Sequence, residues 1–207
     1  MIQEYFNTPS ENFIKFYEDL GDSTFGKKIH VYNIDISDID EISSYDLAIF
    51  YLGDNKNVEN LRRKIYSLEF GNWSLKLIDL GAFNLGHSKS DSLFGIQEII
   101  RKLTNLGVYT LMIGGSQSDI DVYCRSLKSN DFIDVVSIDK FLGIGESIDK
   151  NESSNYLSRI ILDENIKLST FSNVGYLRHL NNTKKISLVD KFNFETLSLG
   201  HLKHDIK

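Results

Sequence analysis

Short apolar runs alternate with amphipathic helical patterns along the chain, and this alternation constrains the fold more than any other feature of the sequence. Strands are predicted over Lys28–Ile34, Leu47–Leu52, Leu75–Leu80, Val108–Ile113, Phe132–Ile138 and Lys167–Val174. Helices are predicted over Ser10–Leu20, Val58–Leu68, Ser90–Leu106, Ser118–Leu127 and Ser154–Leu162. Because strands that are separated by helices pair in parallel through right-handed crossovers, we expect a three-layer α/β fold around a largely parallel sheet.

The length and composition fit one globular domain. The chain has 207 residues, a single proline and no low-complexity linker, so we expect residues 1–207 to form one domain. Its hydrophobic content of 41% and charged content of 25% are close to the averages for ordered proteins. The formal net charge of -6 argues against a nucleic-acid partner, which usually requires a basic surface.

The sequence shows no sign of a membrane span or of an oxidising compartment. The longest apolar runs fall far short of the ~20 residues that cross a bilayer. Cys124 is the single cysteine and has no partner for an intramolecular disulfide, and the first residues do not resemble a leader peptide. We therefore expect a cytoplasmic protein, with Cys124 as a packed thiol.

Glycines and polar residues follow the predicted strand over 108–113. Open parallel sheets bind ligands beyond the carboxyl ends of their strands, so this loop is a candidate site. Gly114 and Gly115 permit a tight turn, and Ser116 or Ser118 would cap the next helix. The alternative is a cradle for a small anion, although the loop lacks the lysine of a P-loop and the third glycine of a dinucleotide-binding motif.

Two further groups of residues imitate metal sites. His201 and His204 lie three residues apart near the C-terminus, where a metal site is not expected. The acidic stretch Asp35–Glu41 lacks the glycine and the distal glutamate of a calcium loop, so we interpret it as a solvated loop or short helix. Neither group indicates a functional metal.

Three strand-end segments resemble motifs of the arginase-type ureohydrolases. Ile113–Ser118 resembles their Gly-Gly-Asp-His-Ser motif, Val135–Phe141 resembles their Asp-Ala-His-x-Asp motif, and Ile78–Gly81 resembles their Asp-x-Gly segment. With Gly71–Trp73 and Phe171–Tyr176, the chain resembles most the divergent formimidoylglutamase branch of Bacteroidetes-type bacteria. The resemblance covers nearly the whole chain and implies a shortened ureohydrolase-like fold, because family members are longer.

The resemblance also implies that the metal site of the family is lost. Ureohydrolases hold two manganese ions with histidine and aspartate ligands, and the bridged water attacks a guanidinium or formimidoyl carbon. Asp139 keeps one ligand position, but Ser116 and Gln117 stand where the family has aspartate and histidine, and Phe141 and Gly143 replace a histidine and a second aspartate. We therefore expect no metal, no cofactor and no catalytic residues, and we expect Phe141→His alone to restore no activity.

These losses favour a non-catalytic arginase-fold protein, a pseudoenzyme that acts through a protein partner or self-association. Gly115, Ser116, Gln117 and Asp139 would line a vestigial pocket. One alternative is a manganese-dependent hydrolase of formimidoyl or guanidino compounds, with ligands supplied differently or by another chain. Another is a small-molecule sensor that offers the Gln117 amide to its ligand.

The shortening predicts a gap in the sheet. The resemblance implies that later strands of the family insert between the strand ending near Asp79 and the strand ending near Gly114. Unpaired buried backbone groups cost about 1–3 kcal/mol each, so such a gap must close. We expect the strands over 75–80 and 108–113 to pair directly, with strands donated by another chain as the alternative.

Overall fold

The chain folds into two compact units in the computed structural model, which describes residues 2–35, 40–127, 132–145 and 155–205. Unit 1 is Met1–Gly115 and unit 2 is Ser116–Lys207. No proline or low-complexity stretch marks the division between them, which is why composition alone points to one domain. Each unit has its own sheet and its own apolar core.

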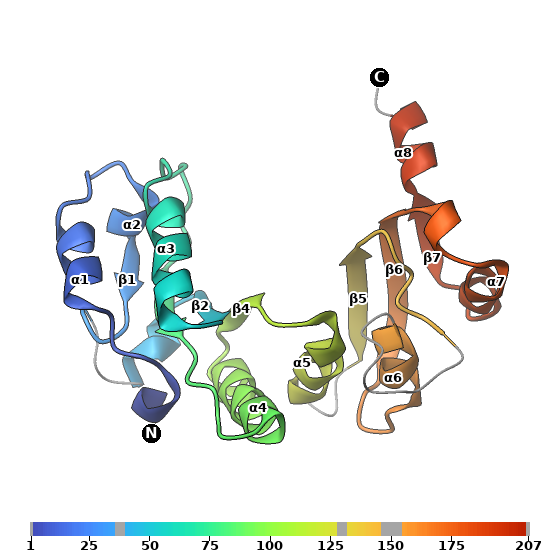
Figure 1. The fold of residues 1–207 in the computed structure, drawn as a ribbon, viewed down its shortest axis with the longest axis horizontal. Coiled ribbons are helices and arrows are strands. Elements are labelled where there is room, and N and C mark those ends of the chain that lie inside the picture. The colour runs from blue at the N-terminus through green and yellow to red at the C-terminus, as the bar shows by residue number, and fades with distance from the viewer. Residues whose placement is uncertain (1, 36–39, 128–131, 146–154, 206–207) are drawn as a thin grey trace. The chain divides into compact units, whose positions relative to one another are not determined.

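Unit 1 is built on a four-stranded parallel sheet with the order β1-β3-β2-β4 (Figure 1). Its strands are β1 (Ile29–Val31), β2 (Leu47–Leu52), β3 (Leu77–Ala82) and β4 (Tyr109–Gly114). Its helices are α1 (Glu11–Glu18), α2 (Phe25–Lys28), α3 (Asn55–Tyr66) and α4 (Lys89–Asn105), with 3-10 turns at Ile2–Tyr5 and Asp40–Ser44. The predicted α/β class with parallel strands is confirmed.

Capping residues set where the helices of unit 1 begin. The backbone N–H of Phe13 donates to Ser10 Oγ at 3.2 Å, so α1 begins just after Ser10. Ser88 and Asp91 form a reciprocal capping box at the start of α4. The apolar face predicted for the first helix is buried through Phe13 and Tyr17.

The order of strands corrects the predicted closure of the sheet. β3 and β4 do not pair with each other, because β2 lies between them and is parallel to both. β1 already occupies the other side of β3, so the crossover through α4 brings β4 to the free side of β2. The predicted gap in the sheet beside β3 is therefore also wrong, since β3 pairs with β1 on one side and with β2 on the other.

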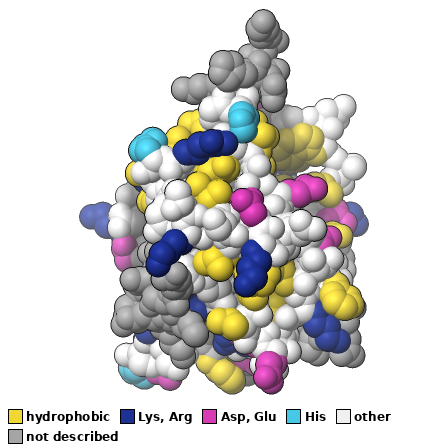
Figure 2. Space-filling view, turned by 90° about the vertical axis from the view of Figure 1, so that its right-hand side faces the viewer, with side chains coloured by type: hydrophobic (Ala, Val, Ile, Leu, Met, Phe, Trp, Pro, Cys, Tyr) yellow, Lys and Arg dark blue, Asp and Glu magenta, His cyan; other side chains and the backbone are white. Residues whose placement is uncertain are grey.

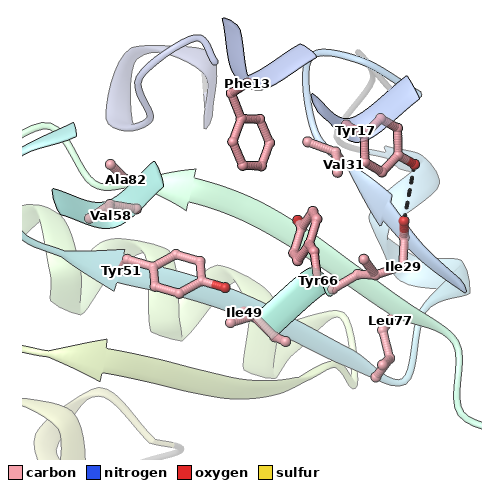
Figure 3. Packing of buried hydrophobic residues seen from close by; sticks show 10 residues of the cluster. All are labelled: Phe13, Tyr17, Ile29, Val31, Ile49, Tyr51, Val58, Tyr66, Leu77 and Ala82. Carbon is pink, nitrogen blue, oxygen red and sulfur yellow. Dashed lines mark hydrogen bonds between the residues drawn. The ribbon is translucent and has the colours of Figure 1, made fainter. Parts of the chain in front are cut away.

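The core of unit 1 packs one face of the sheet against α1 and α3 (Figure 3). Ile49 and Tyr51 of β2 lie in this cluster with Phe13 of α1 and Tyr66 of α3. Successive strand residues point to opposite faces, so the even-numbered residues of β2 face the other way. Ala48 and Phe50 on that side are buried as well, as is the α4 face that carries Ile96, Ile99, Ile100 and Leu103, which makes this sheet apolar on both faces.

Unit 2 contains a three-stranded parallel sheet with the order β5-β6-β7. Its strands are β5 (Ile133–Ile138), β6 (Leu168–Tyr176) and β7 (Glu195–Ser198). Its helices are α5 (Ile120–Ser126), α6 (Tyr156–Leu162), α7 (Thr183–Lys191) and α8 (Leu199–Asp205), with 3-10 turns at Gln117–Asp119 and Arg178–Leu180. The sequence did not predict α7, β7 or α8, because these elements are short and polar.

One face and one edge of the unit 2 sheet are exposed in the part of the chain that the structure describes. Ile133 and Val135 of β5 pack toward the core cluster, whereas Val136 and Ile138 are 68% and 85% exposed. β5 pairs with β6 on one side and with no other described strand. β4 of unit 1 likewise pairs only with β2 among the described strands, and its Tyr109 is 78% exposed.

A search of the described residues for a membrane span is negative. Within those ranges, every helix is too short or too polar to cross a bilayer.

Candidate functional site

The glycine that ends β4 and the one that follows it form the tight turn expected from the sequence. Gly114 and Gly115 have φ values of 100° and 82°, a region that favours glycine. A Cβ on Gly114 would lie 2.4 Å from the carbonyl oxygen of Leu52, so no other residue fits there. Helix α5 then begins at Ile120 with Asp119 at the N-cap position, in place of either predicted serine.

The structure brings together Gln117 and Asp139, two of the four residues predicted to line a vestigial pocket, and both lie in unit 2. The Gln117 amide Nε2 donates a short hydrogen bond to Asp139 Oδ2. The other carboxylate oxygen, Oδ1, accepts from the backbone N–H of Phe141 at 3.3 Å. An amide at the position of a histidine therefore occupies the one carboxylate that remains from the family's ligand set.

Gly143 stands where the ureohydrolase motif carries its second aspartate, and a buried ring lies directly against it. Its φ of 68° is left-handed, and a Cβ built on it would lie 2.5 Å from Cε1 of Tyr156. Tyr156 is 2% exposed, and its hydroxyl donates to Ser137 Oγ at 2.9 Å, which fixes the ring. An aspartate at this position would meet both the wrong backbone conformation and an occupied space.

The residues at these strand ends do not fit a binuclear manganese centre. The binuclear manganese centre of the motif takes hard oxygen ligands together with imidazole, and Asp139 is the single carboxylate among the positions that the resemblance marks as metal ligands. Phe141 supplies an apolar ring where the motif has an imidazole. The side-chain amide of Asn173 donates a hydrogen bond to the backbone carbonyl oxygen of Phe141 at 3.1 Å. Nowhere in the described ranges do three or more His, Cys, Asp or Glu side chains gather in a ligating arrangement.

Asp79, which belongs to the Asp-x-Gly segment, lies at the centre of a buried polar network in unit 1. Its Oδ2 accepts from Arg62 Nε at 3.0 Å, from Tyr66 at 2.5 Å and from Tyr51 at 3.2 Å, and its Oδ1 accepts from the backbone N–H of Gly81 at 2.7 Å. Burial, followed by the charge of Asp79, raises the pKa of both phenols, so they remain protonated donors. Both oxygens of this buried carboxylate accept hydrogen bonds from groups of unit 1, which indicates a structural role for Asp79.

Cys124 behaves as the packed thiol that the sequence indicates. It belongs to the unit 2 core and is buried. Burial, and after it the charge of Asp121, raises the pKa of the Cys124 thiol to about 11. The thiol is therefore protonated at neutral pH and unsuited to nucleophilic chemistry.

Tyr156 is the residue of this region that sequence reasoning missed. It begins α6, and its position gives no hint that its ring packs against Gly143 thirteen residues earlier. The signal that the sequence offers is the glycine at position 143, since a glycine at a ligand position indicates either a turn or a close contact.

The chain is similar in fold to solved structures of the arginase superfamily. No protein-family model and no curated protein sequence matches the chain. Formimidoylglutamase from Bacillus subtilis superposes with a TM-score of 0.67 at 14% identity, over 86% of this chain and 60% of that one. An arginase superfamily protein from Trypanosoma cruzi gives 0.65 at 12% identity, over 82% and 65% of the two chains.

A third solved structure shows the same likeness in fold. A putative agmatinase from Clostridium difficile gives a TM-score of 0.59 at 16% identity, over 74% of this chain and 62% of that one. The chain thus has the arginase-superfamily fold but spans less than two thirds of the length of these proteins.

Proposed function

We propose that this chain, which has the arginase-superfamily fold, is a non-catalytic relative that functions by binding another polypeptide. The observation that carries the proposal is the contact between Gly143 and Tyr156. A lost ligand can be regained when its space stays open, but here a fixed aromatic ring fills the space. The amide of Gln117 on the carboxylate of Asp139 supports the same conclusion.

The open strand edges support a role in protein binding. Natural proteins protect such edges with charged residues, prolines or bulges, because unpaired backbone groups recruit other strands. The only charged residue of β5 is Asp134, and β4 has none. The edge of β5 that no described strand pairs with, together with the exposed Val136 and Ile138, therefore offers backbone hydrogen bonds and apolar contact area to a partner strand.

Titration of the purified chain with Mn²⁺ tests the non-catalytic part of the proposal. We expect no saturable binding at micromolar Mn²⁺ in isothermal titration calorimetry, because Asp139 is the single ligand left at the motif positions. We expect the same of Phe141→His, which restores one ligand of several. Two Mn²⁺ ions bound per chain would instead support a hydrolase of formimidoyl or guanidino compounds. A formiminoglutamase from Trypanosoma cruzi, which is similar in fold, has been solved with Mn²⁺.

Charged substitutions on β5 test the protein-binding part. The test is a quantitative pull-down from an extract of the source organism, with the wild-type chain and the double variant Val136→Lys/Ile138→Lys as baits. We expect the double variant to capture at least tenfold less of each protein that binds specifically to the wild-type bait. Two cationic side chains would be desolvated in the interface. Both residues are exposed in the free chain, so folding should be unaffected.

Leu162→Lys is the matched control for that experiment. Leu162 ends α6 in the same unit and is 60% exposed, so its substitution makes the same chemical change away from the strand. It should keep the partners of the wild-type bait. If both baits retain the same proteins and the same self-association in sedimentation velocity, β5 is not the binding surface.

A further inference from the structure

A pocket of about 480 Å³ opens at the carboxyl ends of β6 and β7 in unit 2. The last residues of the two strands, Tyr176 and Ser198, are paired in the parallel sheet, and both line the pocket. Pockets of this size are typical of small-molecule sites, and the carboxyl ends of parallel strands are where α/β proteins place them. None of the motif residues Ser116, Gln117 and Asp139 lines this pocket.

A bulge at the end of β6 brings polar side chains to the pocket wall. The register of β6 against β7 shifts between Val174 and Tyr176, and the residue between them, Gly175, has a φ of 95°. Such a bulge redirects the chain that follows it. The next turn, Arg178–Leu180, supplies Arg178 and His179 to the wall, and α8 supplies His201.

Among the described residues, the lining of the pocket includes basic side chains and no acidic ones. Arg178, His179 and His201 are among the lining residues, and none of the lining residues is Asp or Glu. The chain as a whole has a formal net charge of -6, so this local composition departs from the average surface. Among the ion pairs formed by described residues, none includes these three side chains.

Figure 2 shows one face of unit 2, on which histidine side chains lie near the top with a basic side chain between them, above hydrophobic side chains. Residues of the same kinds line the pocket, where Leu177 and Leu199 occur together with Arg178, His179 and His201. The lining of the pocket therefore combines apolar and basic residues.

We propose that this pocket binds a small organic anion, with its carboxylate or phosphate group held by Arg178, His179 and His201 and its carbon skeleton against Leu177 and Leu199. The planar guanidinium of Arg178 can donate two parallel hydrogen bonds to either oxyanion, and each imidazole can donate one N–H. The permanent charge of Arg178 repels a metal ion, so two histidines at this place do not indicate a metal site. This binding site is independent of the proposed protein-binding edge.

Calorimetric titration of the full chain with three probes tests the site. The probes are glutarate, glycerol 3-phosphate and inorganic phosphate. We expect one-to-one binding of at least one of the two organic anions, and weaker binding of inorganic phosphate, which cannot use the apolar wall. Preference for glycerol 3-phosphate would assign a phosphate ligand, and preference for glutarate a carboxylate ligand.

Substitutions of exposed side chains show whether the measured binding occurs in this pocket. Arg178→Gln is expected to weaken binding tenfold or more, and His201→Gln severalfold, because each removes a charge-assisted donor. Lys191→Gln, which removes a positive charge from the end of α7 in the same unit, should change affinity less than twofold. The proposal is overturned if the wild-type chain binds none of the three probes, or if Arg178→Gln binds as tightly as the wild type.

Discussion

Gly143→Ala is expected to destabilise unit 2 by about 2–5 kcal/mol, since left-handed backbone strain costs about 1–2 kcal/mol and an overpacked core about 1–3 kcal/mol more. The added methyl group would lie 2.5 Å from the ring of Tyr156, which is held by its hydrogen bond to Ser137. The change should appear as faster amide hydrogen exchange across β5 and β6. Gly143→Asp should lose at least as much stability and still bind no Mn²⁺.

A second glycine in the same unit separates the two causes of that loss. Gly175 also has a positive φ, but a Cβ there would have no atom within 4 Å. Gly175→Ala should therefore lose only the backbone contribution, about 1–2 kcal/mol. Equal losses in the two variants would mean that the Tyr156 ring moves aside at little cost, and the space for an aspartate would then be open.

Asp79→Asn is expected to destabilise unit 1 by about 3–5 kcal/mol, which is the usual effect of leaving one partner of a buried ion pair without its counter-charge. Asp79 and Arg62 are 0% and 1% exposed, so solvent cannot compensate for the lost charge. Urea unfolding followed by the fluorescence of Trp73 would measure the change. Trp73 is the only tryptophan of the chain and lies in unit 1, so the signal reports on that unit alone.

Two further variants make this second prediction specific to the buried network. Arg62→Met/Asp79→Asn should lose less than the sum of its single changes, because removing both charges leaves neither one unpaired. Arg101→Met, in an exposed pair with Glu98, should lose at most about 1 kcal/mol. If the loss of unfolding free energy in the double variant equals the sum of the losses in the two single variants, Arg62 and Asp79 stabilise unit 1 separately.

The sequence predicts where the helices and strands of this protein lie better than it predicts which strands pair with one another. Periodicity locates α4 to within a residue or two, because its caps and apolar face are local features. The strand order β1-β3-β2-β4 depends on which edge of the sheet is free when the helical connection brings the next strand back to the sheet. No local sequence pattern encodes that choice. The short elements after β6 escape prediction because packing in unit 2, rather than their own apolar content, fixes them.

In the candidate site, likewise, some contacts can be predicted from sequence motifs and others cannot. The partnership of Gln117 with Asp139 follows from two strand-end motifs that were visible in the sequence. The contact of Tyr156 with Gly143 and the gathering of Arg178, His179 and His201 join segments whose proximity only the fold creates. Arg178, as a single basic residue after β6, forms no recognisable motif in the sequence. Only the folded structure, with the bulge in β6 and the end of β7 beside it, places His201 in the same pocket.

The sheet of unit 1 is assembled entirely from residues that precede unit 2, and this has a consequence for biosynthesis. The last strand to join is β4, whose outer edge is unpaired by any described strand. At the usual rate of about 5–20 residues per second, the ribosome needs several seconds to add unit 2. During that interval the nascent chain presents β4 with an apolar, uncharged edge, which is the kind of surface that chaperones and neighbouring nascent chains bind.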